Sequence, residues 1–201
     1  PCGVNLDLFK PIDREIARAE LRLDHQKVIL FVGRLEPLKG LEQLLIALSQ
    51  MKGKEMLQLV VIGGDEYSET KIQSLQEMAA KLHIQDRVNF TGAVIQERLP
   101  LFYNAADVCV IPSYYESFGM VALESLACGT PVIATDVGGM RDIISHPAAG
   151  YVVKDNSPHI LASKITKVLN QKGNLTPETE FTRSLIINYR WSNIAAMLLD
   201  E

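Results

Sequence analysis

The most constraining feature of this sequence is a set of short runs in which nearly every residue is apolar. The first, Lys27–Gly33, reads KVILFVG, and its apolar residues do not alternate with polar ones. Such runs are typical of strands in a parallel sheet that is covered on both faces. Comparable runs predict further strands at Met56–Ile62, Arg87–Thr91, Asp107–Ile111, Pro131–Thr135 and Gly150–Val153. We therefore expect a parallel sheet of six strands.

Longer segments with helical periodicity separate these strands. In Lys39–Met51, the leucines at positions 41, 44, 45 and 48 share one face of a helix. The same pattern predicts helices at Glu69–Leu82, Gln96–Ala105, Phe118–Ala127, Gly139–Ile144, Pro158–Gln171, Pro177–Asn188 and Trp191–Leu199. Alternation of strands with helices predicts a doubly wound, Rossmann-like α/β fold with helices on both faces of the sheet.

The first part of the chain departs from this alternation. We expect residues 1–26 to form a connector with a short charged helix at Asp13–Leu21, and residues 27–201 to form the Rossmann-like unit. A length of 201 residues suits one domain of generous size. Because the chain begins with Pro1 and not with Met, we expect it to be a fragment of a longer protein.

Charge and composition disfavour several classes of function. The net charge of −4 gives no basic surplus for nucleic acid. The four histidines are scattered without metal-ligand spacing. Three widely spaced cysteines argue against a disulfide framework and fit a reducing compartment. No apolar run is long enough to span a membrane. The chain is therefore expected to be cytoplasmic.

In a doubly wound fold, ligands bind outside the carboxyl ends of the strands. The loop after the first expected strand reads GRLEPLKG and carries Arg34 and Lys39. We place Lys39 in the first turn of the next helix, where a cation opposes the helix dipole. An anion shared by both side chains and the helix amides would make this arrangement favourable. The alternative is an ordinary pair of basic residues on a surface loop.

The loop after the fourth expected strand predicts a second anion site. Its sequence, ESFGMVALE, starts a helix that Ser117 can cap through its hydroxyl group. The amides of Gly119, Met120 and Val121 would then be among the unpaired donors of the first turn. Gly119 has no side chain, so a ligand could approach the backbone closely.

Two glutamates flank this cradle. Glu124 is the only formal charge between Glu116 and Asp136, and a carboxylate in so apolar a stretch is costly to bury without a partner. Carboxylates beside a phosphate site would repel the phosphate, so they are better placed to accept hydrogen bonds from the hydroxyl groups of a sugar. The alternatives are an exposed loop acid for Glu116 and, for Glu124, a structural acid that is salt-bridged within the domain.

Several familiar nucleotide motifs are missing from the sequence. No G-x-G-x-x-G follows the first expected strand, which disfavours dinucleotide binding of the dehydrogenase type. There is no Walker A lysine motif, and no D-x-D pair to hold a metal-bridged diphosphate. We therefore expect neither a metal nor any other cofactor.

Four segments, PCGVNLDLFKP, GRLEPLKG, ESFGMVALE and GTPVIATDVGG, resemble the C-terminal half of retaining glycosyltransferases of the GT-B fold, family 4. The resemblance covers nearly the whole chain in the right order, and E-x7-E joined to G-R-x-x-x-x-K-G is a specific combination. The sequences of these motifs are most similar to those of family members that resemble sucrose-phosphate synthase and inositol-phosphate N-acetylglucosaminyltransferase.

The resemblance implies roles for individual residues. It implies that Arg34 and Lys39 grip the diphosphate of a nucleotide-sugar donor, that Glu116 lies beside the transferred sugar, and that Glu124 holds the ribose hydroxyls. It further implies a catalytic part for Glu116, Arg34 and Lys39, and donor contacts from Gly33, Phe118, Gly119, Met120, Val121, Glu124 and the loop from Gly92 to Val94. The donor would be an NDP-sugar, with UDP as the expected nucleotide.

The same resemblance implies that the N-terminal GT-B half, which carries the acceptor site, is missing from this chain. The acceptor would be a sugar, a polyol or a lipid-linked sugar, and any peripheral contact with a membrane would depend on that missing half. The family often has Pro-Glu where Arg141-Asp142 follow the glycine pair, which leaves the contacts of that loop open. A nucleotide-sugar epimerase, a phosphorylase and a non-catalytic nucleotide-sugar-binding module remain alternatives at this point.

Overall fold

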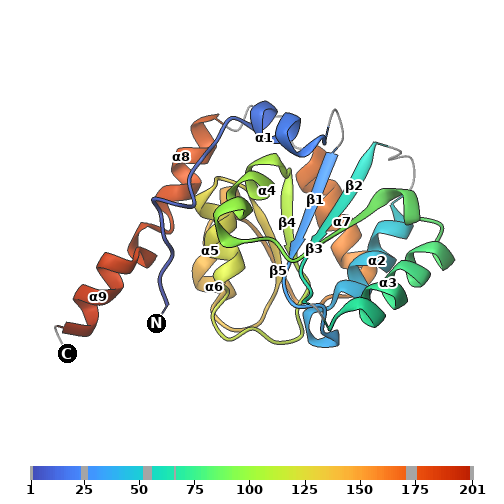
Figure 1. Cartoon of the computed structure of the whole chain (residues 1–201). Coiled ribbons are helices and arrows are strands. Elements are labelled where there is room, and N and C mark those ends of the chain that lie inside the picture. Colours follow the sequence, from blue (N-terminus) through green and yellow to red (C-terminus); the bar gives the residue numbers. More distant parts are fainter. Residues whose placement is uncertain (1, 24–26, 52–55, 66, 171–175, 200–201) are drawn as a thin grey trace.

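A parallel sheet of six strands runs through the computed structural model of the chain, which describes residues 2–23, 27–51, 56–65, 67–170 and 176–199. The strand order is β3-β2-β1-β4-β5-β6, and every neighbouring pair is parallel (Figure 1). The strands are β1 (Lys27–Val32), β2 (Leu57–Ile62), β3 (Val88–Gly92), β4 (Val108–Ile111), β5 (Val132–Thr135) and β6 (Gly150–Val153). The predicted doubly wound, six-stranded α/β fold is confirmed.

Helices cover both faces of this sheet (Figure 1). They are α1 (Arg14–Leu21), α2 (Leu41–Gln50), α3 (Glu69–Lys81), α4 (Leu99–Ala105), α5 (Met120–Ala127), α6 (Met140–Ile143), α7 (Pro158–Asn170), α8 (Thr176–Ser184) and α9 (Trp191–Leu199). Short 3-10 turns lie at Pro37–Lys39, Gln85–Arg87, Gln96–Arg98, Pro147–Ala149 and Ile187–Tyr189.

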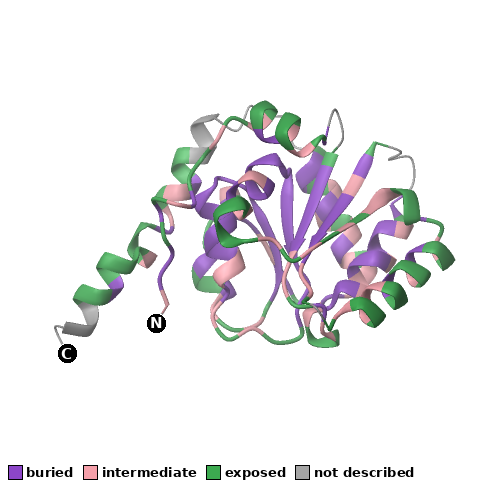
Figure 2. Ribbon diagram, in the orientation of Figure 1, coloured by how far each residue is buried: buried purple, intermediate pink, exposed green. Residues whose placement is uncertain are grey.

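The two faces of the sheet explain the unbroken apolar runs. In β1, Val28 and Leu30 contribute to the core shared with α4 and α5, whereas Ile29 and Phe31 contribute to the core shared with α2, α3 and α7. Figure 2 accordingly shows the central strands as buried between two layers of helices. Since neither face of these strands meets water, no polar alternation is needed.

Helices α2 and α5 each begin two residues later than the sequence pattern predicts. Helix α2 begins at Leu41, because Lys39 ends a separate 3-10 turn and Gly40 turns the backbone into the left-handed region at φ 69°. Helix α5 begins at Met120, with Gly119 in the capping position at φ 96° and no side-chain cap. The prediction that Ser117 caps α5 is therefore wrong.

Other predicted helices are divided or shortened. The segment predicted as one helix from position 96 is a 3-10 turn followed by α4, and the one predicted from position 177 is α8 followed by the turn at Ile187–Tyr189. Helix α7 ends at Asn170, and the predicted end at Gln171 lies outside the described residues.

The first described segment packs against the rest of the chain. Val4, Leu6 and Phe9 are buried in the same core as α4 and α5. Asp107, which is itself buried, accepts hydrogen bonds from Arg18 at 2.7 Å and from the backbone N–H of Val28 at 2.8 Å. This carboxylate joins α1 to the sheet. The predicted boundary at residue 26 stays a prediction, because residues 24–26 are not described.

Candidate functional site

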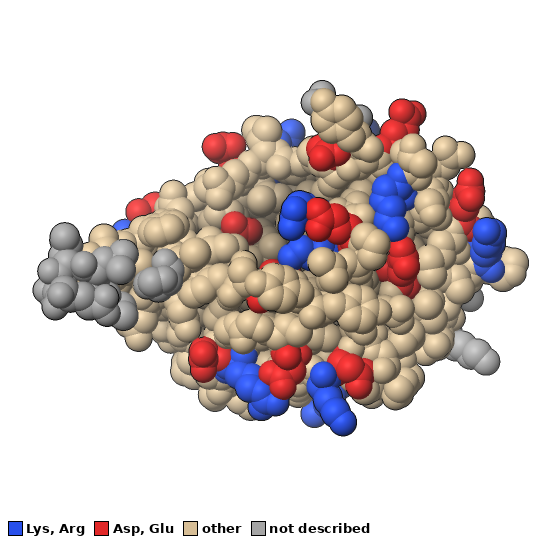
Figure 3. Space-filling model, turned by 90° about the horizontal axis from the view of Figure 1, so that it is seen from below, with Lys and Arg blue, Asp and Glu red and all other residues tan. Residues whose placement is uncertain are grey.

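The predicted site residues gather at the edge of the sheet where the strands end. This edge faces downward in Figure 1, and Figure 3 looks directly onto it. Figure 3 shows charged side chains of both signs around a hollow near the middle of this face. Loops that follow different strands therefore share one surface, as expected for a doubly wound fold.

A cavity of about 470 Å³ opens between the loops that follow β1, β2 and β3. Its lining includes Gly33, Arg34 and Val94, three of the predicted site residues, together with Leu35 and Leu99. Backbone groups and apolar side chains thus form a concave surface of the kind that holds a small molecule. Gly92 ends β3 just before this lining, and the remaining predicted residues lie outside the lining of the cavity.

Lys39 and Glu116 meet where the loop after β4 joins the loop after β1. The Lys39 Nζ atom lies 2.6 Å from Glu116 Oε1, and only 19% of the lysine side chain and 14% of the glutamate side chain are exposed. Ser113 also donates a hydrogen bond to Oε1, at 2.9 Å. Glu116 is therefore not an exposed loop acid, and the alternative stated above is wrong. This carboxylate balances the charge of Lys39. Lys39 itself lies before α2, so its predicted place in the first turn of that helix is also wrong.

The backbone holds this ion pair in place from two loops. The backbone N–H of Tyr114 donates to the carbonyl oxygen of Leu38 at 2.8 Å, which joins the loop after β4 to the loop after β1. Gly40 packs so closely that an added Cβ would lie 2.0 Å from the carbonyl oxygen of Pro112. That carbonyl also accepts a hydrogen bond from Asn156 Nδ2 at 2.8 Å. Because β1 and β4 are neighbours in the sheet, the two loops come together without any long excursion.

Arg34 lies at the rim of the cavity and remains exposed. Its guanidinium group pairs with Glu36 at 2.9 Å, while 75% of the Arg34 side chain stays accessible. Exposed pairs of this kind contribute little free energy, so Arg34 can turn toward an anion at small cost.

The start of α5 presents backbone donors without acceptors. Within the described chain, the N–H groups of Gly119, Met120 and Val121 have no hydrogen-bond acceptor. A Cβ on Gly119 would lie 2.8 Å from Cε of Met140, so only glycine fits this cap without displacing its neighbour. The ring of Phe118 packs edge-on against Tyr189 at a centroid distance of 6.1 Å. Free amides at a helix N-terminus form a ready site for an anion.

Glu124 is buried on α5 and bonds to a phenol. The Tyr103 hydroxyl group donates to Glu124 Oε2 at 2.7 Å, and only 8% of Glu124 is exposed. Burial raises the pKa of the Glu124 carboxyl group, and the Tyr103 hydrogen bond offsets part of that rise. No salt bridge to Glu124 occurs among the residues that the structure describes, in contrast to the structural alternative.

Tyr103 is the site residue that sequence reasoning missed. It lies in α4, 21 positions before Glu124, and it looks like an ordinary apolar core residue in the sequence. The only available signal was the isolated charge of Glu124, which required a buried partner without indicating which one.

The open question about Arg141 has a local answer. Its guanidinium group forms two hydrogen bonds to the carboxylate of Asp136, one from Nε at 2.6 Å and a second from Nη2. This contact lowers the pKa of Asp136. Arg141 therefore pairs with a residue of its own segment and links the start of α6 to the loop after β5.

Among the described residues, no three side chains of His, Cys, Asp or Glu gather into a possible metal site. In the same part of the chain, no helix combines the length and apolar character that crossing a membrane requires.

Comparison with known proteins gives a consistent family. The family model for "Glycosyl transferases group 1" matches residues 13–185. The D-inositol 3-phosphate glycosyltransferase of Mycobacteroides abscessus is 39% identical over 205 residues, which cover 99% of this chain and 44% of the relative. The chain thus spans about half the length of the curated relatives that it matches.

Solved structures agree with this result. The sucrose-phosphate synthase of Thermosynechococcus elongatus superposes with a TM-score of 0.85 at 34% identity, over 100% of this chain and 50% of that protein. The Anabaena protein Alr3699/HepE, solved with UDP and glucose, shares the fold with a TM-score of 0.84 at 22% identity, over 99% of this chain and 55% of that one. A D-inositol 3-phosphate glycosyltransferase and a sucrose-phosphate synthase are both among the relatives, so the resemblance to GT-B glycosyltransferases is confirmed. The chain belongs to the group 1 glycosyltransferases and corresponds to about half of a GT-B enzyme.

Proposed function

We propose that this chain is the donor-binding domain of a retaining hexosyltransferase of family 4 that takes a UDP-sugar. The observation that carries the proposal is the meeting of Lys39 and Glu116 three residues before the unpaired amides that start at Gly119. A basic side chain, a carboxylate and free helix amides together suit a ligand that has both a diphosphate and sugar hydroxyl groups.

In this proposal the parts of the donor follow the edge of the sheet. The base lies in the cavity against Val94, and the ribose hydroxyls donate to Glu124. Arg34, Lys39 and the amides at the start of α5 receive the diphosphate. The solved Anabaena protein that shares this fold contains UDP, which supports the choice of base.

The same groups can assist departure of the nucleotide. When the bond from the anomeric carbon to the diphosphate breaks, negative charge develops on the leaving oxygen, and Arg34, Lys39 and the helix amides stabilise it. Lys39 must then exchange its carboxylate partner for a phosphate. Glu116, once released, can accept a hydrogen bond from a hydroxyl of the transferred sugar. We propose front-face departure and attack, as the resemblance to this family implies, with Glu116 binding a hydroxyl of the transferred sugar and forming no covalent bond to it.

The proposed partners follow from the length of the relatives. An acceptor sugar, polyol or lipid-linked sugar would be held by the N-terminal half of the longer protein, and no metal would be needed because the diphosphate is held by side chains and amides. The exposed face of α9 around Trp191 is a proposed docking place for that half.

Calorimetric titration of the chain with nucleotides tests this function. UDP should bind better than AMP or NAD, and the affinity should persist when a chelator removes divalent metal. If no nucleoside diphosphate binds, the proposed function is wrong. A preference for GDP or ADP would overturn only the choice of base, and a strict need for Mg²⁺ would overturn only the metal-independence.

A further inference from the structure

Tyr103 occupies an unusual position for a polar side chain. Its relative exposure is 0%, and it lies within the cluster of buried side chains beneath α5, where its hydroxyl group reaches Glu124 Oε2 at 2.7 Å. A buried tyrosine hydroxyl normally needs a hydrogen-bond partner. Burial and the nearby carboxylate raise the pKa of Tyr103 well above its usual value, so the hydroxyl group keeps its proton and acts as a donor.

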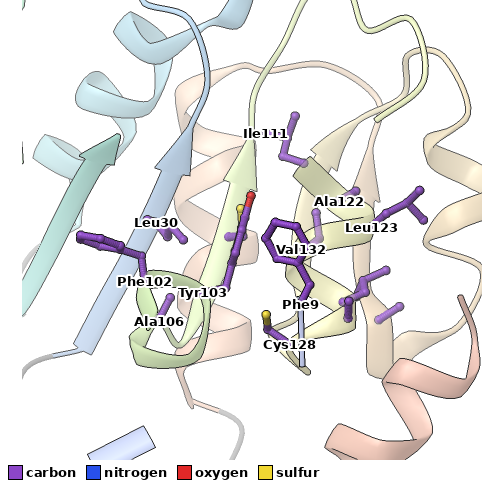
Figure 4. Close-up of a cluster of buried hydrophobic side chains, with 14 of the residues drawn as sticks. Phe9, Leu30, Phe102, Tyr103, Ala106, Ile111, Ala122, Leu123, Cys128 and Val132 are labelled. Carbon is purple, nitrogen blue, oxygen red and sulfur yellow. The ribbon is translucent and has the colours of Figure 1, made fainter. Parts of the chain in front are cut away.

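The ring and the backbone of Tyr103 are both held by neighbouring residues. Phe9 lies beside the ring in Figure 4 and packs edge-on against it. The two ring centroids are 6.0 Å apart, and the interplanar angle is 70°. The hydroxyl group of Thr130 donates to the backbone carbonyl of Tyr103 at 2.6 Å. Since aromatic packing and a buried hydrogen bond restrict it, the phenol has little freedom to leave the carboxylate.

This arrangement leaves the two oxygens of Glu124 unequal. Oε2 accepts from Tyr103, whereas Oε1 has no hydrogen-bond partner in the part of the chain that the structure describes. Glu124 is also not completely closed off from solvent, because 8% of the residue remains accessible. One oxygen is thus anchored, and the other is available to a ligand.

We propose that Tyr103 is a positioning residue that orients Glu124 so that its free oxygen accepts the hydroxyl groups of the donor's ribose. The inference rests on the proposed function, because it takes Glu124 as the acceptor for ribose. Without the phenol, the carboxylate would rotate freely about its last side-chain bond and would also titrate at higher pH. Tyr103 itself does not touch the nucleotide.

The test compares two ligands in wild type and in Tyr103→Phe. UDP carries both ribose hydroxyls, and 2′,3′-dideoxy-UDP carries neither. Calorimetry should show that Tyr103→Phe weakens UDP roughly tenfold, the size expected for one hydrogen bond to a charged group. The affinity for the dideoxy ligand should change by less than about twofold, because that ligand makes no use of Glu124.

Thr130→Val is the matched control. It removes a buried hydrogen bond to the same tyrosine but leaves the phenol and Glu124 intact. It should lower the thermal midpoint while keeping the wild-type ratio of UDP to dideoxy-UDP affinity. If Tyr103→Phe and Thr130→Val change this ratio alike, or if Tyr103→Phe weakens both ligands equally, Tyr103 acts only as a structural residue and the inference is wrong.

A measurement on the wild type keeps the inference testable if Tyr103→Phe does not fold. During a UDP titration followed by carbon NMR, the carboxyl resonance of Glu124 should move while the Cζ resonance of Tyr103 stays in place. A large shift of Tyr103 Cζ would mean that the phenol releases Glu124 on binding, which contradicts a positioning role. Failure of the wild type to bind UDP would overturn the proposed function together with this inference.

Discussion

Replacing Gly40 with Ala should disturb the junction that brings Lys39 to Glu116. Gly40 has φ 69° and is buried, and a Cβ there would lie 2.0 Å from the carbonyl oxygen of Pro112 and 2.9 Å from its carbonyl carbon. These atoms belong to the backbone of the loop after β4, so they cannot rotate away as a side-chain tip could. Moving them would also stretch the hydrogen bond from Asn156.

The expected loss of stability has two parts. An L-residue in the left-handed region costs about 1–2 kcal/mol. Forcing an extra carbon into a packed site costs about a further 1–3 kcal/mol. Gly40→Ala should therefore lower the free energy of unfolding by about 2–5 kcal/mol, a large part of the stability of an ordinary domain. It should also weaken UDP binding, because the backbone on both sides of the ion pair shifts.

Gly92→Ala separates the two parts. Gly92 also has a positive φ, of 79°, but a Cβ there would meet no atom within 4 Å. This variant should show only the conformational part, about 1–2 kcal/mol. Urea denaturation of the two variants and the wild type measures the difference. Equal losses in the two variants would show that the contact at Pro112 is not tight, and the reasoning about the loop junction would be wrong.

Three further predictions concern the site. Arg34→Ala and Lys39→Ala should each weaken nucleoside diphosphate binding by about 1.5–3 kcal/mol in calorimetry. Only Lys39→Ala should also lower the thermal midpoint, since it leaves Glu116 largely buried without its cation. Unchanged affinity in both variants would show that the diphosphate binds elsewhere. The preference for UDP over its dideoxy analogue should fall as the pH drops through the pKa of Glu124, which is raised above the usual 4.5, because the protonated acid is a weaker acceptor; a pH-independent preference would contradict the role in ribose binding. The raised pKa also means that the contribution of Glu124 to stability is present at low pH and is lost as the pH rises through that pKa. Glu124→Gln should therefore flatten this part of the curve of stability against pH. The chain alone should transfer no sugar from UDP-sugars to added acceptors, as judged by mass spectrometry, because holding the acceptor in line supplies about 7–11 kcal/mol of barrier lowering. Robust transfer by residues 1–201 would show that the site is complete here. In the longer protein, Glu116→Gln should lower turnover more than UDP affinity.

The helix boundaries next to the site depended on packing that a local pattern does not contain. Ser117 is a good capping residue by type, yet Gly119 takes that position because its φ of 96° favours glycine, and a Cβ there would also press on the tip of Met140. Lys39 follows the helical periodicity of α2 but lies in a separate turn, because Gly40 reverses the backbone between them.

By itself, the sequence determined the class of fold and the loops to inspect. Unbroken apolar runs can be buried only between two layers, and alternation with helices then requires a parallel sheet, so the strands and their ligand-binding edge followed from local composition. The lone charge of Glu124 in an apolar run marked a buried polar site, because a carboxylate is costly to bury without a partner. Only the tertiary structure decided the partners, since Lys39 and Glu116 are 77 positions apart and Tyr103 and Glu124 lie on different helices. Those pairings depend on β1 lying beside β4 and on α4 packing against α5, and short-range preferences along the chain carry no information about which side chains meet across such contacts.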